Sequence, residues 1–148
     1  MKKFILILSL LLCGCATTNK VIDNVVIEYQ GIQDNIKIGD SKEKFLSLLE
    51  PNQSKLNAAS RKPPTRYTEN GSVFDVYYIR TGRIPDGATT DDEFTPYIFK
   101  DGALAEIGWE HLGGAKRTSV DVAKEYAEIR KAEAGATKVE TNWAINNE

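Results

Sequence analysis

Three groups of residues in this sequence are of types that could carry chemistry. Cys13 and Cys15 are the only cysteines in the 148 residues, and one glycine separates them. His111 is the only histidine, and three carboxylates stand together at 91–93 in the stretch TTDDEF. These groups could serve a disulfide or metal site, a proton relay, or a hard cation, and the surrounding sequence must decide between these uses.

The position of the two cysteines points to processing of the chain. A disulfide across a single residue would close a very tight ring, which strains the geometry that a disulfide needs. Two cysteines are also fewer than the four ligands of a structural zinc site. Both follow Met1, two lysines and the apolar run FILILSLLL at 4–12, which have the form of a secretory signal. The run is too short to span a bilayer, which takes about 20 apolar residues.

The stretch Leu12-Cys13-Gly14-Cys15 resembles the bacterial lipobox, in which small residues precede an obligatory cysteine. The resemblance implies that the thiol of Cys15 takes a diacylglycerol, that residues 1–14 are cleaved away, and that the new amino group is acylated. A thiolate is the best alkylation nucleophile of a protein chain. An ordinary signal peptide cut nearby is the alternative.

The residue after the lipobox bears on where the protein is sorted. Ala16, and not aspartate, follows Cys15. By resemblance to the sorting rules of such lipoproteins, this favours the outer membrane, with the domain facing the periplasm. We therefore expect the protein to be attached to the membrane by the lipid on Cys15.

Composition limits the remaining functions. Without residues 1–14 the chain has 134 residues, with 17 basic and 21 acidic side chains, a length suited to one domain with a modest core. A net charge of about −4 argues against nucleic acid as a partner, because no basic surface would hold phosphates. No cysteine other than Cys15 remains in this part of the chain.

The other two groups give no clear catalytic or metal site. His111 beside Glu110 could form a proton relay, but a surface histidine after a strand is the simpler alternative. The carboxylates at 91–93 could hold calcium, yet they lack the alternating ligands of an EF-hand, and a solvated acidic loop is the alternative. No G-x-S-x-G nucleophile elbow occurs. We therefore expect no enzyme, no catalytic residue, no metal and no cofactor.

Periodicity predicts helices on both sides of a group of strands. Ser41 is a plausible N-cap, followed by an apolar stripe that includes Phe45 and Leu49, and Pro51 is expected to end this helix. Near the C-terminus, Val122, Tyr126 and Ile129 recur at helical spacing over 118–134, with Gly135 as the C-cap.

Between the helices, residue types favour an antiparallel sheet. Strands are expected at 72–81, 95–100 and 103–110, because β-branched and aromatic residues are frequent there. Asp101-Gly102 joins the last two strands as a hairpin, with Phe99 opposite Leu104 and Ile98 opposite Ala105 unless the turn is bulged. A further extended piece could lie near Arg66.

Several motifs follow one another along the chain: Ile38-Gly39-x-Ser41-x-Glu43, an apolar helix, Pro51, a loop, a strand with Tyr77 and Tyr78, and Phe99-x-Asp101-Gly102-x-Leu104. This order resembles that of the SmpA/OmlA (BamE-like) lipoproteins. The resemblance covers about 36–109. It implies an α+β fold with a small three-stranded antiparallel sheet and a helix packed on one face, close to β-lactamase-inhibitor-like repeats. Gly31 falls where the first helix of the family would lie, which counts against that helix here.

The expected organisation has four parts. These are a cleaved signal at 1–14, a lipidated tether at 15–35, the α+β domain at 36–112, and a Gly-Gly hinge with the C-terminal amphipathic helix and tail at 113–148. One sheet face should carry the Phe45 helix. The C-terminal helix should cover the other, or stand detached and bind a partner.

Two functions fit this organisation. The first is a non-enzymatic envelope lipoprotein that acts as a protein-binding scaffold, in outer-membrane protein assembly or envelope maintenance as the family resemblance implies. The alternative is an inhibitor-like or ligand-binding periplasmic module, and an envelope hydrolase is a third. The candidate contacts with an envelope protein partner are Tyr77, Phe99 and Trp109, although Trp109 could instead belong to the core.

Overall fold

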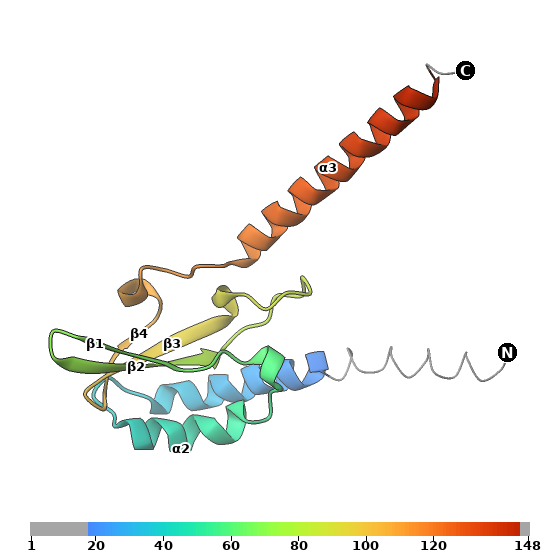
Figure 1. The fold of residues 1–148 in the computed structure, drawn as a ribbon. Helices are drawn as coiled ribbons and strands as arrows, with labels where there is room; N and C mark the ends of the chain where they lie inside the picture. Colours follow the sequence, from blue (N-terminus) through green and yellow to red (C-terminus); the bar gives the residue numbers. More distant parts are fainter. Residues whose placement is uncertain (1–17, 146–148) are drawn as a thin grey trace.

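The structure is a computed structural model that describes residues 18–145, and of residues 135–145 only the backbone course. Cys15 and the expected signal at 1–14 lie outside this range. The fold is α+β, with an open four-stranded antiparallel sheet in the order β1-β2-β3-β4. Two helices cover one face of the sheet, and a third helix extends from the domain (Figure 1).

The elements follow one another along the chain, and the longest connection is the loop at 81–90 between β2 and η3. They are an N-terminal helix at 18–32, η1 (Gln33–Asn35), α2 (Lys42–Gln53), η2 (Ala58–Ser60), β1 (Thr65–Glu69), β2 (Ser72–Arg80), η3 (Asp91–Glu93), β3 (Phe94–Lys100), β4 (Ala103–Ile107), η4 (Glu110–Leu112) and α3 (Ser119–Ile145).

The N-terminal helix corrects the expectation of a tether over 15–35, which is wrong for residues 18–35. Ile22, Val25 and Tyr29 are buried, and their spacing of three and four residues places them on one side of a helix. Gly31 does not prevent the helix, because it lies in the last turn, and a glycine in a helix costs only about 1 kcal/mol. The helix that Gly31 counted against is therefore present.

Polar contacts fix this helix to the rest of the domain. The hydroxyls of Tyr29 and Tyr97 are 2.7 Å apart in the core, and burial raises the pKa of Tyr97. The side-chain amide of Asn52 donates to the carbonyl oxygen of Val25 at 3.1 Å. Asn52 is buried, so this bond satisfies a donor that would otherwise cost free energy.

Helix α2 begins as predicted and ends slightly later. The Ser41 hydroxyl accepts a hydrogen bond from the backbone N–H of Lys44 at 3.2 Å, which confirms the N-cap. Phe45 and Leu49 are buried one turn apart. Pro51 lies inside the helix, which runs to Gln53, because a proline removes only one backbone donor so close to the helix end.

The sheet has one strand more than predicted. β1 pairs with β2 through a two-residue turn at Asn70 and Gly71, both with positive φ. Asn-Gly is the strongest short signal for such a hairpin, so the strand could have been identified from the sequence. The predicted hairpin at Asp101-Gly102 is confirmed, again with both residues at positive φ.

A bulge changes the pairing of the last two strands. Phe99 lies opposite Leu104, as predicted, but Ile98 lies opposite Glu106 and not Ala105. One extra residue in β4 therefore shifts the register. β4 ends at Ile107, so Trp109 stands outside the strand that was expected to carry it.

The two faces of the sheet are covered differently. On one face, residues from the N-terminal helix and α2 pack on the strands, in a cluster of Tyr29, Ile36, Phe45, Leu49, Ile79, Tyr97, Phe99 and Leu104. The opposite face holds a smaller cluster of Phe74, Val76 and Ile98, with the half-buried Tyr67, Tyr78 and Leu112 beside it. Leu112 comes from η4, so a short turn rather than α3 covers part of this face.

Helix α3 leaves the domain after its first turn. Val122 is 2% exposed, but Tyr126 and Ile129 are 53% and 47% exposed, and every residue from 123 to 134 is exposed. Of the two alternatives for this helix, packing on the second sheet face is therefore wrong beyond Val122, and the described side chains agree with the detached helix. Gly135 does not end the helix either, since a glycine inside a helix costs only about 1 kcal/mol.

This arrangement predicts different costs for two aromatic truncations. Phe45→Ala should lower the free energy of unfolding by about 3 to 5 kcal/mol, because it opens a cavity under α2. Tyr126→Ala should change it by less than about 0.5 kcal/mol, because the ring is exposed. Chemical denaturation of a soluble form without residues 1–15 measures both. A large effect of Tyr126→Ala would mean that α3 packs on the domain in solution.

Candidate functional site

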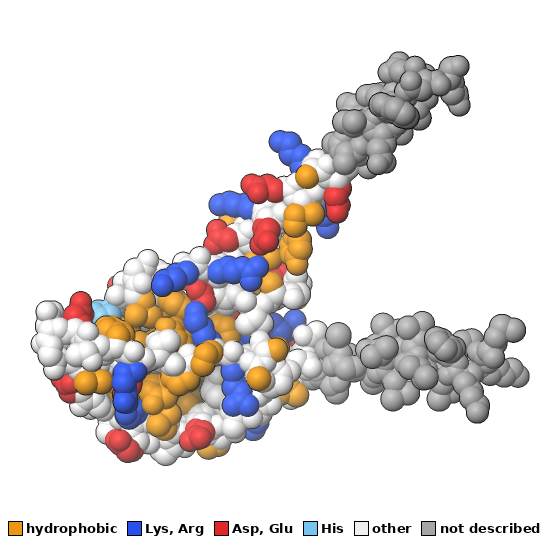
Figure 2. Space-filling model, in the orientation of Figure 1, with side chains coloured by type: hydrophobic (Ala, Val, Ile, Leu, Met, Phe, Trp, Pro, Cys, Tyr) orange, Lys and Arg blue, Asp and Glu red, His pale blue; other side chains and the backbone are white. Residues whose placement is uncertain are grey.

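An aromatic surface lies at the outer side of β2, between α2 and η4. It consists of two depressions of about 250 Å³ each, which share Lys62 and Tyr78. We call this surface the aromatic groove, and its main apolar lining residues are Leu46, Pro64, Tyr77, Tyr78, Trp109 and Leu112. Figure 2 shows a broad hydrophobic area on the domain, with Lys and Arg side chains at its border.

The groove exists because β1 is shorter than β2. β1 begins at Thr65, opposite Val76, so it does not continue beside the end of β2. At Arg80 the side chain of Gln53 replaces a strand, accepting from the backbone N–H at 2.9 Å and donating to the carbonyl at 3.3 Å. Tyr77 and Tyr78 lie between these two points and remain half-exposed.

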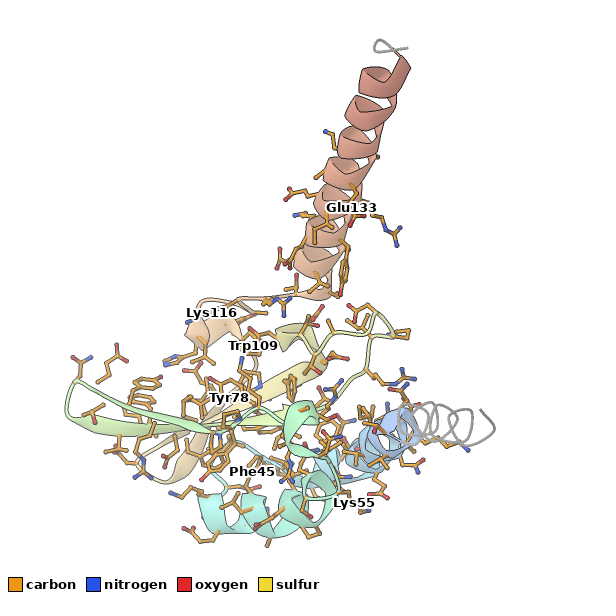
Figure 3. All side chains as sticks on the ribbon, turned by 45° about the vertical axis from the view of Figure 1, so that its right-hand side comes forward. Phe45, Lys55, Tyr78, Trp109, Lys116 and Glu133 are labelled. Carbon is orange, nitrogen blue, oxygen red and sulfur yellow. The ribbon has the colours of Figure 1, made fainter. Side chains whose placement is uncertain are left out.

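Lys62 lies over two aromatic rings at the centre of the groove. Its ammonium group is 4.6 Å from the ring centre of Tyr78 and 4.9 Å from that of Trp109, and the two rings stack with centres 5.6 Å apart. Figure 3 shows Tyr78 and Trp109 between α2 and the segment that leads to α3. Such cation–π contacts hold the rings in place while one side stays open.

The three predicted partner contacts have different positions. Tyr77 is half-buried and packs against Phe45, with ring centres 5.8 Å apart. Trp109 is also half-buried, and its indole N–H donates to the carbonyl of Phe94 at 2.8 Å. Phe99 is 0% exposed beneath α2, so its side chain is in the core and not on a binding surface, contrary to expectation.

The acidic run is a set of internal contacts and not a solvated loop. Asp91 pairs with Lys62 and accepts from the backbone N–H groups of Lys116 and Arg117 at 2.9 and 3.2 Å. Asp92 accepts from the hydroxyl and the N–H of Ser119, where α3 begins. These two carboxylates therefore fix the linker after η4 and the first turn of α3.

Glu93 carries the third carboxylate into the interior. It is 0% exposed and lies 2.7 Å from the guanidinium of Arg80, which is itself buried. It also accepts from the N–H groups of Ile84 and Thr90 at 2.8 and 3.1 Å. Burial lowers the pKa of Arg80, while the charge of Glu93 opposes this shift. Removing one partner of such a pair typically costs about 3 to 5 kcal/mol.

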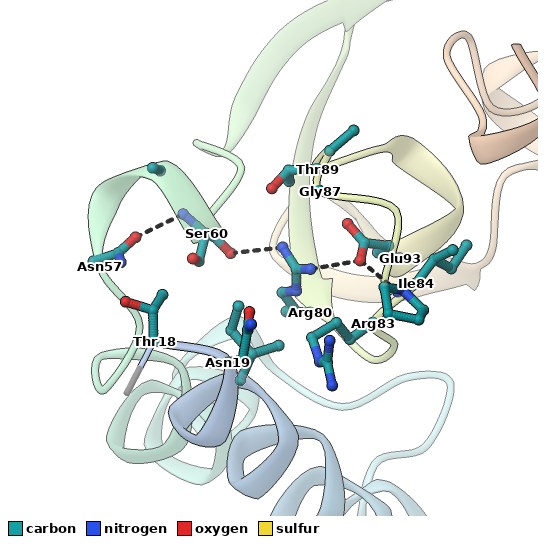
Figure 4. Close-up of a pocket in the computed structure, with 14 residues that line it drawn as sticks. Thr18, Asn19, Asn57, Ser60, Arg80, Arg83, Ile84, Gly87, Thr89 and Glu93 are labelled. Carbon is teal, nitrogen blue, oxygen red and sulfur yellow. Dashed lines mark hydrogen bonds and ion pairs between the residues drawn. The ribbon is translucent and has the colours of Figure 1, made fainter. Parts of the chain in front are cut away.

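A cavity of about 430 Å³ lies beside this ion pair, between the N-terminal helix, η2 and the loop after β2 (Figure 4). The Arg80 guanidinium in its wall already donates to the carbonyls of Gly82 and Ser60 and pairs with Glu93. Arg83 pairs with Asp23 at 2.6 and 3.0 Å. Because these cations have internal partners, the cavity gives the ligand-binding alternative no particular support.

His111 is paired, although not with its neighbour in the sequence. One ring nitrogen lies 3.0 Å from Glu106, and the other lies 3.2 Å from the hydroxyl of Tyr67. The ring stacks on Phe74. The carboxylate that His111 contacts belongs to Glu106 and not to Glu110, the partner considered for a relay. The β3–β4 hairpin brings Glu106 close to His111. Among the described residues, no group of His, Cys, Asp and Glu is arranged to hold a metal ion.

The exposed side of α3 combines apolar residues with charges of both signs. Tyr126, Ile129 and Glu133 share one side of the helix at spacings of three and four residues, Glu125 lies four residues before Ile129, and Arg130 lies four residues after Tyr126. Lys124 and Lys131 are two residues away from stripe positions and therefore lie on the opposite side. Figure 3 shows Glu133 on the part of α3 that is remote from the domain.

Comparison of the chain with protein-family models, with curated proteins and with solved structures finds no match to any of the three. Within residues 18–145, no helix combines the length and the apolar character that crossing a membrane requires.

The contacts of Asp91 predict how its side chain titrates. Burial alone would raise the pKa of Asp91, but Lys62 and the N–H groups of Lys116 and Arg117 outweigh burial and lower it below 3.8. A lowered pKa means that the contact with the linker is present at neutral pH and is lost only as the pH falls through that lower value.

In NMR spectra, the amide signals of Lys116 and Arg117 should therefore titrate with a midpoint below the pKa of an ordinary aspartate. The change should disappear in Asp91→Asn. A midpoint at or above that of an ordinary aspartate, or an unchanged titration in the variant, would contradict the bonds to Asp91.

Proposed function

We propose that this protein is a lipid-anchored protein of the bacterial envelope and acts as a non-enzymatic scaffold that binds another protein. The single observation that carries the proposal is α3, which exposes every residue from 123 to 134 to solvent. Most helical stability in proteins comes from packing of an apolar face, and an isolated helix is marginal in water. A helix that exposes Tyr126 and Ile129 in this way is suited to packing against a partner.

The contacts at the base of α3 support this proposal. Asp91 and Asp92 bind the linker and Ser119, and Val122 is buried. These contacts direct the helix away from the sheet, as Figure 1 shows. The helix is therefore presented in a defined direction, which lowers the entropy that a partner must overcome on binding.

The residues of α3 also indicate the chemistry of the partner. Glu125 and Arg130 flank the apolar stripe, four residues from Ile129 and from Tyr126, whereas Lys124 and Lys131 lie opposite. The complementary surface is an apolar groove with charges of both signs at its rim. We propose a protein of the envelope with such a groove as the partner of α3.

The cellular process is proposed from the resemblance to the SmpA/OmlA lipoproteins. The order of helix, helix and antiparallel strands, with both helices on one sheet face, is compatible with the fold that this resemblance implies. We propose a BamE-like domain, with a role in outer-membrane protein assembly or envelope maintenance, located on the periplasmic side of the outer membrane.

Lipidation has a direct test in cells. Cys15→Ser should abolish labelling by a fatty-acid analogue and should leave an unprocessed precursor, because no other thiol occupies the lipobox position. Cys13→Ser should leave labelling and processing almost unchanged, since Cys13 departs with the signal. Equal loss in both variants would contradict the assignment of Cys15.

The role of α3 is tested by co-purification of the full-length acylated protein in mild detergent after crosslinking. The double variant Tyr126→Ser, Ile129→Ser should lose its partner while the domain keeps its melting temperature, because both side chains are exposed. Lys124→Ser, Lys131→Ser is the matched control on the opposite side and should retain the partner. Loss in both variants, or in neither, would refute binding through the apolar stripe.

A further inference from the structure

The beginning of the folded domain lies very close to the proposed lipid anchor. Only Ala16 and Thr17 separate Cys15 from Thr18, where the described helix starts. Three peptide units span at most about 11 Å between Cα atoms. The interfacial layer of a bilayer is itself several ångströms thick on each side, so Thr18 cannot lie far from the headgroups once Cys15 is acylated.

Thr18 belongs to a helix that is firmly held in the domain. Ile22 and Val25 are buried against Leu56, and Asp23 forms a two-bond ion pair with Arg83. One turn further, Asn52 donates to the carbonyl of Val25. Because this helix is part of the packed domain, the short distance between Cys15 and Thr18 limits how far the whole domain can lie from the bilayer.

Three segments surround Thr18 and form one end of the molecule. They are the first turn of the N-terminal helix, the stretch 55–60 that contains η2, and the loop at 83–89 after β2, and together they line two adjoining depressions. Figure 4 shows Thr18 and Asn19 beside this cavity, with Asn57 and Ile84 across it. The β1–β2 turn lies at the opposite end of the sheet (Figure 1).

The composition of this end suits a bilayer surface. The only acidic side chain that lines the two depressions is Glu93, which is buried and paired with Arg80. Val21, Ala59 and Pro85 are exposed small or apolar residues, and Lys55 adds a basic side chain, which pairs with Glu28. The loop at 83–89 also carries Asp86, which accepts from the backbone N–H of Ala88 at 2.9 Å, so the contact depends on the short connection and the apolar residues and not on charge.

We infer that the end of the domain formed by Thr18, residues 55–60 and residues 83–89 rests on the phospholipid bilayer, and that the protein is not suspended on a long tether. This inference depends on the proposed acylation of Cys15 and extends it to an orientation. In this orientation the β1–β2 turn, at the opposite end of the sheet, faces away from the lipid contact.

Fluorescence quenching in vesicles tests the orientation. The acylated protein carries no reactive thiol in 16–148, so Ala59→Cys, Pro85→Cys and the remote Glu69→Cys can each be labelled at a single site. The vesicles contain phosphatidylethanolamine, phosphatidylglycerol and a lipid with a spin label at the headgroup. Quenching should be several-fold stronger at positions 59 and 85 than at position 69.

A longer linker provides the matched control. A flexible Gly-Ser insertion of about 20 residues between Thr17 and Thr18 has a mean span of about 25 Å. It should reduce quenching at 59 and 85 several-fold if the short connection holds the domain at the bilayer. Unchanged quenching at 59 and 85 would show that the face binds lipid by itself, which also supports the contact.

Two negative results are distinguishable. If the protein takes up the fatty-acid analogue but positions 59 and 85 are quenched no more than position 69, the orientation is wrong while the lipid anchor stands. If the analogue is not incorporated and the protein does not remain with the vesicles, the proposed anchor fails, and the inferred orientation fails with it.

Discussion

The buried ion pair between Arg80 and Glu93 is the interaction on which the rest of this structure depends. It joins the end of β2 to the start of β3 at 2.7 Å with almost no exposure to solvent, where an unpaired charge would be very costly. The carboxylate also accepts from the N–H groups of Ile84 and Thr90, and the backbone carbonyl of Glu93 accepts from Thr81. The long loop between the two strands is thereby closed at its base.

Closing this loop places two further carboxylates where they control the C-terminal part of the chain. Asp91 and Asp92 directly precede Glu93, and they bind Lys62, the linker and Ser119. The same short segment therefore sets the direction of α3 and holds Lys62 over the rings of the aromatic groove. This explains why α3 extends outward while η4 covers only part of the second sheet face. It also connects a buried charge pair with the helix that we propose for binding.

The proposed functions use different segments of the chain. The N-terminal helix is packed from its first described turn and leaves little chain between the domain and Cys15, which favours a fixed position on the bilayer. Residues 123–134 of α3 are exposed, so a protein partner can reach them. A short connection to the lipid and an exposed helix at the other terminus are consistent with a scaffold that holds its partner near the membrane.

The sequence by itself determined features that depend on neighbouring residues, which are the N-cap at Ser41 and the hairpin at Asp101-Gly102. The signal and the lipobox are likewise read from neighbouring residues, and they stay predictions. Asn70-Gly71 carried the same kind of signal for β1, and the spacing of Ile22, Val25 and Tyr29 carried one for the N-terminal helix. Only the tertiary structure decided what the acidic run does, that Phe99 is buried, and that α3 stands free. Those outcomes depend on which distant groups meet, such as Arg80 with Glu93 or Asp92 with Ser119, and local residue patterns do not specify such pairings.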